Sequence, residues 1–310
     1  MPELNLTTLT RDYGDPTAEA QACRTSCALF DFSFVARACV RGPDALALLG
    51  RLTGRSMADL APGQIRYAVR TNADGALISD LTVWKHHDGG YEIMSGRHAD
   101  LVVLARAGNA ETIVEDLTAE TAIFAVQGPD TLATLAGLTD TDAVTRLAYF
   151  GHCRTRIMDV PCLIGRLGYT GEAGVEIILP KARAPEVWQN LAERAQPAGF
   201  AAADILRIEA GFILFANEFR LPVRPAEVGL ARFAGAANEE TPIRLVCFKA
   251  RTQERPVLWR PKREPSRPQS CGDLIATSAC WSALAQGALG LGYAASADLD
   301  EGATLSDPTG

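Results

Sequence analysis

The chain reads Gly168-Tyr169-Thr170-Gly171-Glu172-Ala173-Gly174-Val175-Glu176-Ile177 just before an apolar stretch that ends at Leu179. Glycine tolerates positive φ and close backbone approach, so three glycines in ten residues favour a tight turn. Such a turn would direct Tyr169, Glu172 and Glu176 at a common target before a strand begins. On spacing alone, a hairpin turn with solvated glutamates is the simpler interpretation.

Further segments follow a fixed order on either side of this turn. They are Asp31-Phe32-Ser33, Val40-Arg41-Gly42-Pro43-Asp44-Ala45, Pro62-Gly63-Gln64 with Tyr67, Thr71-Asn72-Ala73-Asp74-Gly75 followed by Asp80-Leu81, Ala125-Val126-Gln127-Gly128-Pro129, and Leu206-Arg207-Ile208-Glu209-Ala210-Gly211. Together with the glycine turn, they resemble the signature segments of the aminomethyltransferase family, the T-protein of the glycine cleavage system. The resemblance spans about residues 28–217 and continues more weakly to the C-terminus.

The resemblance implies an α+β fold. T-protein-like chains place ferredoxin-like modules of antiparallel sheet and helices around a central cavity, followed by a small C-terminal β-barrel. By this comparison residues 1–225 form the folate-binding region, with two intertwined modules, one of them inserted at about 50–120. Residues 226–310 form a connector and a shortened barrel domain. Local patterns predict a helix over 16–29 and a hairpin of strands over 64–71 and 76–84.

Composition narrows the class of protein. The chain has 310 residues and a net charge of −7, which argues against a general nucleic-acid binder. No apolar run reaches the roughly 18 residues of a membrane span, and the N-terminus has no signal-peptide pattern, so we expect a cytoplasmic protein without a membrane partner. None of the eight cysteines forms a C-x-x-C pair, which predicts free thiols and no metal site. No G-x-G-x-x-G fingerprint for a flavin or nicotinamide occurs.

The resemblance also implies a reaction. Tetrahydrofolate, bound as a co-substrate in the central cavity, would accept a one-carbon unit from an aminomethyl group on a partner's lipoyl arm or from a small-molecule donor. The pterin edge is rich in N–H donors, which suits a buried carboxylate. Glu176 matches the family's pterin-binding glutamate, and Tyr169 and Tyr67 match positions where a tyrosine lines the cavity or simply packs in the core.

Three further polar residues are candidate folate contacts: Glu172, Arg207 and Gln127. Gln127 follows a predicted strand, where its amide could bind the ligand, but a hydrogen bond to the backbone is the favoured interpretation. Arg207 fits an internal ion pair as well as it fits a ligand contact.

Departures from the family pattern put the chemistry in question. An ungapped comparison puts Ser79 at the family's essential aspartate and Asp80 at the acid that follows. A hydroxyl cannot hold negative charge near neutral pH. Because strand residues alternate between faces, Asp80 would need a register shift or bulge to take its place. Ala203 occupies the position of an arginine that binds the anionic folate tail, and Phe34-Val35 replaces a His-Met pair.

Three functional hypotheses follow. The first is a folate-dependent aminomethyl- or methyl-transferase. The second is a catalytically inactive folate-binding or regulatory paralogue, suggested by Ser79 and Ala203. The third is a subunit-like scaffold, since similar modules form parts of enzymes that oxidise methylated amines.

Overall fold

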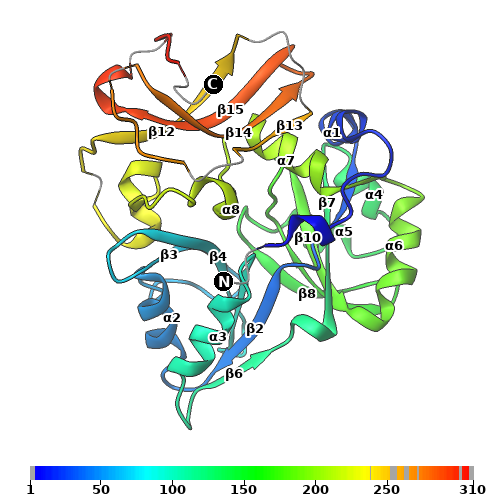
Figure 1. Ribbon diagram of the computed structural model, residues 1–310. Coiled ribbons are helices and arrows are strands. Elements are labelled where there is room, and N and C mark those ends of the chain that lie inside the picture. Colours follow the sequence, from blue (N-terminus) through cyan, green and yellow to red (C-terminus); the bar gives the residue numbers. More distant parts are fainter. Residues whose placement is uncertain are drawn as a thin grey trace.

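The computed structural model describes residues 4–237, 239–251, 257–261, 265–270, 272–299 and 302–306. This part of the chain contains three sheets, nearly all of whose strand pairs are antiparallel. In Figure 1 the six-stranded sheet stands on the right, the five-stranded sheet lies at the lower left, and the four-stranded sheet of the C-terminal segment lies across the top. The mixture of sheets and helices confirms the α+β class.

The six-stranded sheet has the order β11-β1-β7-β10-β9-β8. Its only parallel pair in the described part of the chain is β1 with β11. The strands are β1 (Ala28–Asp31), β7 (Thr121–Gln127), β8 (His152–Ile157), β9 (Val160–Gly165), β10 (Gly174–Pro180) and β11 (Gln196–Ala198).

The five-stranded sheet is entirely antiparallel over its described residues and has the order β3-β4-β5-β2-β6. Its strands are β2 (Ala36–Arg41), β3 (Ile65–Thr71), β4 (Leu77–Lys85), β5 (Tyr91–Ser95) and β6 (Ile113–Asp116). The β3–β4 hairpin forms as predicted because Asn72 Oδ1 accepts hydrogen bonds from the backbone N–H groups of Asp74 (3.0 Å) and Ala76 (2.9 Å).

The C-terminal segment differs from the expected barrel. Its described strands form an open antiparallel sheet of order β12-β15-β14-β13. The strands are β12 (Ile243–Ala250), β13 (Leu258–Trp259), β14 (Leu274–Ser282) and β15 (Gly287–Ala295). Among the described residues β13 contributes only two residue pairs and does not pair with β12, so the sheet is not closed.

Helices cover the outer faces of the two larger sheets (Figure 1). The α-helices are α1 (Pro16–Thr25), α2 (Ala45–Thr53), α3 (Ala99–Ala107), α4 (Thr131–Leu135), α5 (Thr141–Thr145), α6 (Ala184–Ala192), α7 (Phe200–Glu209) and α8 (Phe215–Glu218). Short 3₁₀ helices are η1 (Leu6–Thr8), η2 (Thr118–Glu120), η3 (Lys181–Arg183), η4 (Pro225–Val228), η5 (Ala231–Ala234) and η6 (Ser296–Asp298). None of the described helices is long and apolar enough to cross a membrane.

The first helix is shorter than the sequence predicts. Asp15 caps it by accepting a hydrogen bond from the Thr17 N–H at 2.9 Å, and Pro16 occupies the first turn. The helix ends at Thr25 rather than near residue 29, because Ala28 begins β1, which pairs with β7 and β11. Tertiary pairing therefore overrides the local helical pattern.

The two larger sheets share one apolar core. Ala125 and Ile178 of the six-stranded sheet and Trp84 and Met94 of the five-stranded sheet belong to the same buried cluster, which also includes residues of α7. A second cluster lies between the six-stranded sheet and α6, and a third between the five-stranded sheet and helices α2 and α3. Each larger sheet thus has one face toward helices and one toward the shared core.

Candidate functional site

The glycine turn is held by Gln127 at the end of β7. The Gln127 amide nitrogen donates hydrogen bonds to the carbonyls of Leu167 (3.1 Å) and Val175 (3.2 Å), and its oxygen accepts one from the Thr170 hydroxyl at 3.1 Å. A Cβ on Gly168 would lie 1.8 Å from Gln127 Oε1, so only glycine fits there. Gln127 is fully buried and makes the backbone contacts that the sequence analysis favoured.

Glu172 points to α1 and contacts Arg24. The Arg24 Nη1 lies 2.7 Å from Glu172 Oε1, and the Arg24 Nη2 lies 2.8 Å from Glu209 Oε2. Both acids are largely covered by protein. The contacts join α1, the glycine turn and α7, which gives Glu172 a structural partner. Its folate contact stays a prediction. The sequence analysis missed Arg24, because no local motif marks a residue whose partner lies 148 positions away.

Glu176 lies on β10, on the face of the sheet that borders the shared core. Its neighbours on the flanking strands are Ala125 and Gly165, both small. Trp84 of the other sheet packs on Gly165, where an added Cβ would lie 2.1 Å from the Trp84 ring. Among the described residues, the Glu176 carboxylate accepts no hydrogen bond. Burial raises the pKa of Glu176 to about 7.

Asp80 lies on β4, on the face that also carries Trp84. The Tyr67 hydroxyl donates a hydrogen bond to Asp80 Oδ2 at 3.1 Å. Tyr67 is paired with Thr82 and Asp80 with Val69, so this is a diagonal contact on one face of the hairpin. Burial raises the pKa of Asp80 to about 6, while the Tyr67 hydrogen bond lowers it. Asp80 is therefore a carboxyl group that burial biases toward protonation.

Ser79 points to the opposite side of β4. Its hydroxyl donates a hydrogen bond to Asp100 Oδ2 at 2.5 Å, and both side chains are fully buried. Asp100 lies in the first turn of α3 and also accepts hydrogen bonds from Ser95 (2.8 Å) and Arg70 (2.8 Å). Ser79 thus belongs to a polar network on the helix side of the five-stranded sheet.

The side chains of Ser79 and Asp80 point to opposite faces of β4, as predicted. Asp80 is the one on the face toward the shared core. On that face Asp80 accepts the Tyr67 hydrogen bond, and whether it needs a bulge to take the place of the family's aspartate stays a prediction. The pairing of β3 with β4 is irregular next to Ser79, because Arg70 pairs with Ser79 whereas the next residue, Thr71, pairs with Leu77. The ungapped comparison could not reveal which face of the hairpin borders the second sheet.

Tyr169 lies close to this pair. Its hydroxyl donates a hydrogen bond to the Ile213 carbonyl at 2.6 Å, and its ring stacks on Phe212 with 6.3 Å between ring centres. Burial raises the pKa of Tyr169 well above its usual value, and the nearby charge of Asp80 raises it further. The predicted residues Tyr67, Asp80 and Tyr169 are thus brought together by the fold.

Arg207 is enclosed by protein. Its guanidinium contacts Asp204 (2.7 Å) and Glu218 (3.0 Å) and donates a hydrogen bond to the Ser278 hydroxyl at 2.7 Å. Burial alone would lower the pKa of Arg207, but the charges of Glu218 and Asp204 raise it above its usual value. Arg207 therefore joins α7 and α8 to the C-terminal sheet, which corresponds to the ion-pair alternative. A ligand contact for Arg207 stays a prediction.

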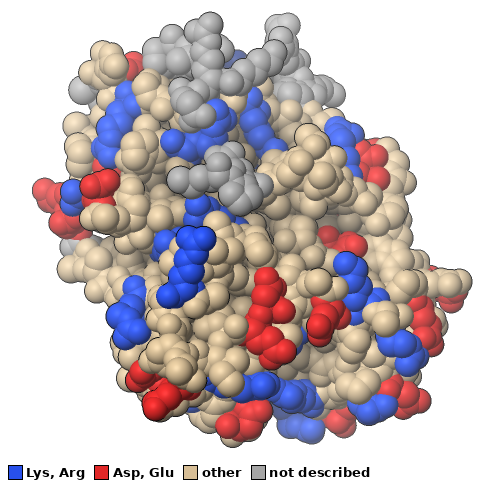
Figure 2. All heavy atoms as spheres, turned by 60° about the horizontal axis from the view of Figure 1, so that its bottom comes forward, with Lys and Arg blue, Asp and Glu red and all other residues tan. Residues whose placement is uncertain are grey.

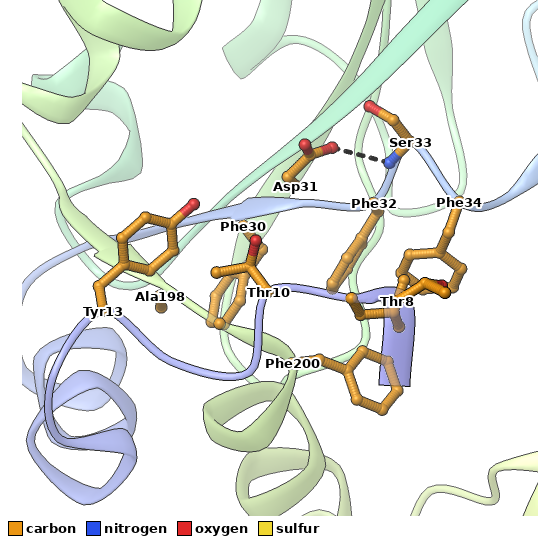
Figure 3. A pocket seen from close by; sticks show the side chains of 12 residues that line it. Thr8, Thr10, Tyr13, Phe30, Asp31, Phe32, Ser33, Phe34, Ala198 and Phe200 are labelled. Carbon is orange, nitrogen blue, oxygen red and sulfur yellow. Dashed lines mark hydrogen bonds between the residues drawn. The ribbon is translucent and has the colours of Figure 1, made fainter. Parts of the chain in front are cut away.

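One surface hollow lies near the N-terminal segment (Figure 3). Its volume is about 130 Å³, and phenylalanines from β1, the following loop and α7 line it together with Tyr13 and Asp31. Phe34 contributes to this wall. Ligand pockets usually measure about 300–1,000 Å³, so this hollow cannot enclose a whole folate.

Two half-buried carboxyl groups with raised pKa values, Asp80 and Glu176, thus border the core shared by two sheets of an α+β protein. Perturbed pairs of this kind are typical of ligand-binding and catalytic sites. The family described as the GCVT N-terminal domain matches residues 11–237. The chain belongs to this family.

Individual relatives agree with this assignment. The chain is 35% identical over 229 residues to an aminomethyltransferase of Streptomyces avermitilis, a match that covers 71% of this chain and 61% of the relative. It is 37% identical over 241 residues to a probable aminomethyltransferase of Natronomonas pharaonis, covering 71% and 64% of the two chains. The chain therefore spans less than two thirds of the length of these curated relatives.

A solved structure extends the similarity to the C-terminal sheet. The crystal structure of the glycine cleavage system aminomethyltransferase T from Bartonella henselae superposes with a TM-score of 0.77 and 25% sequence identity. The superposition covers 94% of this chain and 84% of that one. The T-protein-like fold expected from the motifs is thereby confirmed.

Proposed function

We propose that the chain is a tetrahydrofolate-dependent aminomethyl- or methyl-transferase. The observation that carries the proposal is the Glu176 carboxylate, which borders the shared core and has no hydrogen-bond donor among the described residues. A half-buried carboxylate without a hydrogen-bond donor is costly, whereas the amino-pyrimidinone edge of a pterin would supply N–H donors to it. The residues present therefore fit a reduced folate.

Asp80 is the carboxylate that we assign to the transfer itself. When ionised, it would stabilise the positive charge that develops on the one-carbon unit as this unit passes to the folate. Tyr67 would hold the Asp80 carboxylate in place, since its hydroxyl donates to Oδ2 at 3.1 Å. The donor would be an aminomethyl group on a lipoyl carrier protein or a small methylated molecule.

The inactive alternative loses its main support. It depended on the replacement of an essential aspartate by Ser79, but the Ser79 hydroxyl is bound to Asp100 on the helix side of the sheet. Asp80 supplies a carboxylate on the side of Tyr67 and Tyr169.

Titration calorimetry with a stable reduced folate tests the proposal. We expect micromolar binding to the wild-type chain and at least a tenfold loss for Glu176→Gln. Glu115→Gln is the matched control, because Glu115 is also a strand residue but is exposed. Undetectable binding by the wild-type chain, or equal binding by Glu176→Gln, would contradict the proposal.

A further inference from the structure

A row of paired residues runs across three strands of the six-stranded sheet, on the side of the shared core. Glu176 of β10 pairs with Gly165 of β9, and Gly165 pairs in turn with His152 of β8. Residues directly opposite each other in an antiparallel pair point to the same face of the sheet. Because Gly165 has no side chain, the row leaves a slot between the side chains of Glu176 and His152.

The ring of Trp84, from the five-stranded sheet, fills this slot. A Cβ on Gly165 would lie 2.1 Å from the Trp84 ring, and the centres of the Trp84 and His152 rings are 5.3 Å apart. Trp84 is fully buried, and its indole N–H donates a hydrogen bond to the Thr82 hydroxyl at 2.9 Å. The indole therefore has His152 on one side and covers the position of Glu176 on the other.

His152 also holds the end of the strand that carries Trp84. His152 Nε2 lies 2.9 Å from the Lys85 carbonyl oxygen, so the neutral imidazole donates a hydrogen bond from this nitrogen. The Gly63 N–H donates to the same carbonyl at 2.7 Å. His152 Nδ1 is buried and has no hydrogen-bond partner in the described part of the chain. Burial lowers the pKa of His152 to about 4, so the ring is neutral near neutral pH.

A second histidine, just after β4, supports His152. The ring of His86 meets the ring of His152 edge to face, with 5.1 Å between ring centres. His86 Nε2 lies 3.0 Å from Glu92 Oε1, and Arg37 Nε lies 2.7 Å from Glu92 Oε2. Burial raises the pKa of Glu92, but the contacts with His86 and Arg37 lower it to about 2. His152 is therefore backed by a neighbour that a buried ion pair holds in place.

We propose that His152 is a positioning residue for the candidate site, whose ring keeps Trp84 in the slot and thereby covers one side of the Glu176 carboxyl group. The proposal rests on the proposed function for the role of Glu176 as the pterin-binding group. Loss of the His152 ring would leave a void beside Trp84, and a loosened indole would admit water to Glu176. Water would then supply the hydrogen bonds that we assign to the pterin, which would weaken ligand binding.

The stability that Glu176→Gln adds at about pH 8.5 measures how strongly the carboxyl group is covered. Acidic and basic side chains lie next to one another over much of the lower part of the face drawn in Figure 2. Such exposed charges are screened by salt and give the same background in every variant. Burial raises the pKa of the nearby Tyr149, and the charge of Glu176 raises it further, so Tyr149 stays neutral at this pH.

Urea unfolding of the unliganded protein compares this gain in several backgrounds. The gain should fall to less than half of its wild-type value in His152→Ala. His152→Phe restores a flat ring and removes the unpartnered Nδ1, so it should retain the gain. His98→Ala is the matched control, because His98 is exposed, and it should also retain the gain. A merely structural role of His152 would lower stability equally with and without Glu176→Gln and would leave the gain unchanged.

If His152→Ala does not fold, Trp84→Phe replaces it, since a smaller ring in the slot should also reduce the gain. An unchanged gain in the variant that folds, an equal loss in His152→Phe and His152→Ala, or no gain in the wild-type background would overturn the inference.

Calorimetry with a stable reduced folate connects the packing to binding. His152→Ala should bind the folate at least about fivefold more weakly than wild type, and His152→Phe should bind like wild type. Equal affinity in His152→Ala and wild type would overturn the positioning role. Absence of binding by the wild-type chain would overturn the proposed function, and the unfolding experiment would still decide whether His152 controls the covering of Glu176.

Discussion

Glu176→Gln should make the unliganded protein more stable at alkaline pH while weakening folate binding. Burial raises the pKa of Glu176 from 4.5 to about 7 in the folded chain. A raised carboxyl pKa means that the folded state favours the protonated form. The resulting contribution to stability is fully present below about pH 4.5 and is lost as the pH rises through about 7.

The magnitude follows from this difference. At about 1.36 kcal/mol per pH unit, a pKa raised from 4.5 to about 7 corresponds to about 3 kcal/mol in the free energy of unfolding. Because Glu176 is only half-buried, we expect about 2–3 kcal/mol for the neutral glutamine at pH values above 8. For a chain of 310 residues, such a gain raises the Tm by on the order of 3–5 °C.

Urea or thermal unfolding at about pH 8.5 and about pH 4.5 measures this effect. Glu176→Gln should unfold later than wild type at the higher pH and together with it at the lower pH. Glu115→Gln, the exposed strand control, should stay within about 0.5 kcal/mol of wild type at both pH values. An equal shift at both pH values, or destabilisation at the higher one, would refute the assignment of Glu176 as a half-buried carboxyl without a hydrogen-bond partner.

Three further predictions concern the neighbourhood of the candidate site. Asp80→Asn should lower turnover about 10²–10³-fold with little change in folate affinity, and wild-type turnover should fall below about pH 6 as Asp80 becomes protonated. Ser79→Ala should keep turnover but lose about 1–3 kcal/mol of stability, since it removes a donor to a buried carboxylate. Loss of turnover in Ser79→Ala with turnover retained in Asp80→Asn would exclude Asp80 as the catalytic carboxylate. Tyr67→Phe removes a hydrogen bond that lowers the Asp80 pKa, so the acid limb of the rate profile should move to higher pH; an unmoved limb would mean that another group titrates. Gly168→Ala places a Cβ 1.8 Å from Gln127 Oε1 and should cost about 1–3 kcal/mol in urea unfolding, whereas wild-type stability would argue against the contact.

The sequence by itself determined the family resemblance and much of the local structure. The hairpin of β3 and β4 was predictable, because an Asn-x-x-Gly turn limits the backbone to few conformations wherever it occurs. The glycine turn was predictable for the same reason, as was the presence of Glu176 at the start of the following strand. Strand alternation correctly separated Ser79 from Asp80.

Only the tertiary structure decided which partners these residues meet. Whether Ser79 or Asp80 faces the shared core depends on where the six-stranded sheet lies, and no pattern within β4 records that position. Glu172 contacts Arg24, which is distant in sequence. Arg207 contacts Asp204 within its own helix and Glu218 in the next helix, beyond a turn. The strand β1 is too short for a periodic signal and exists because β7 and β11 pair with it. Local sequence sets backbone conformation, whereas burial and ionic contacts arise from the packing of segments that local sequence cannot specify.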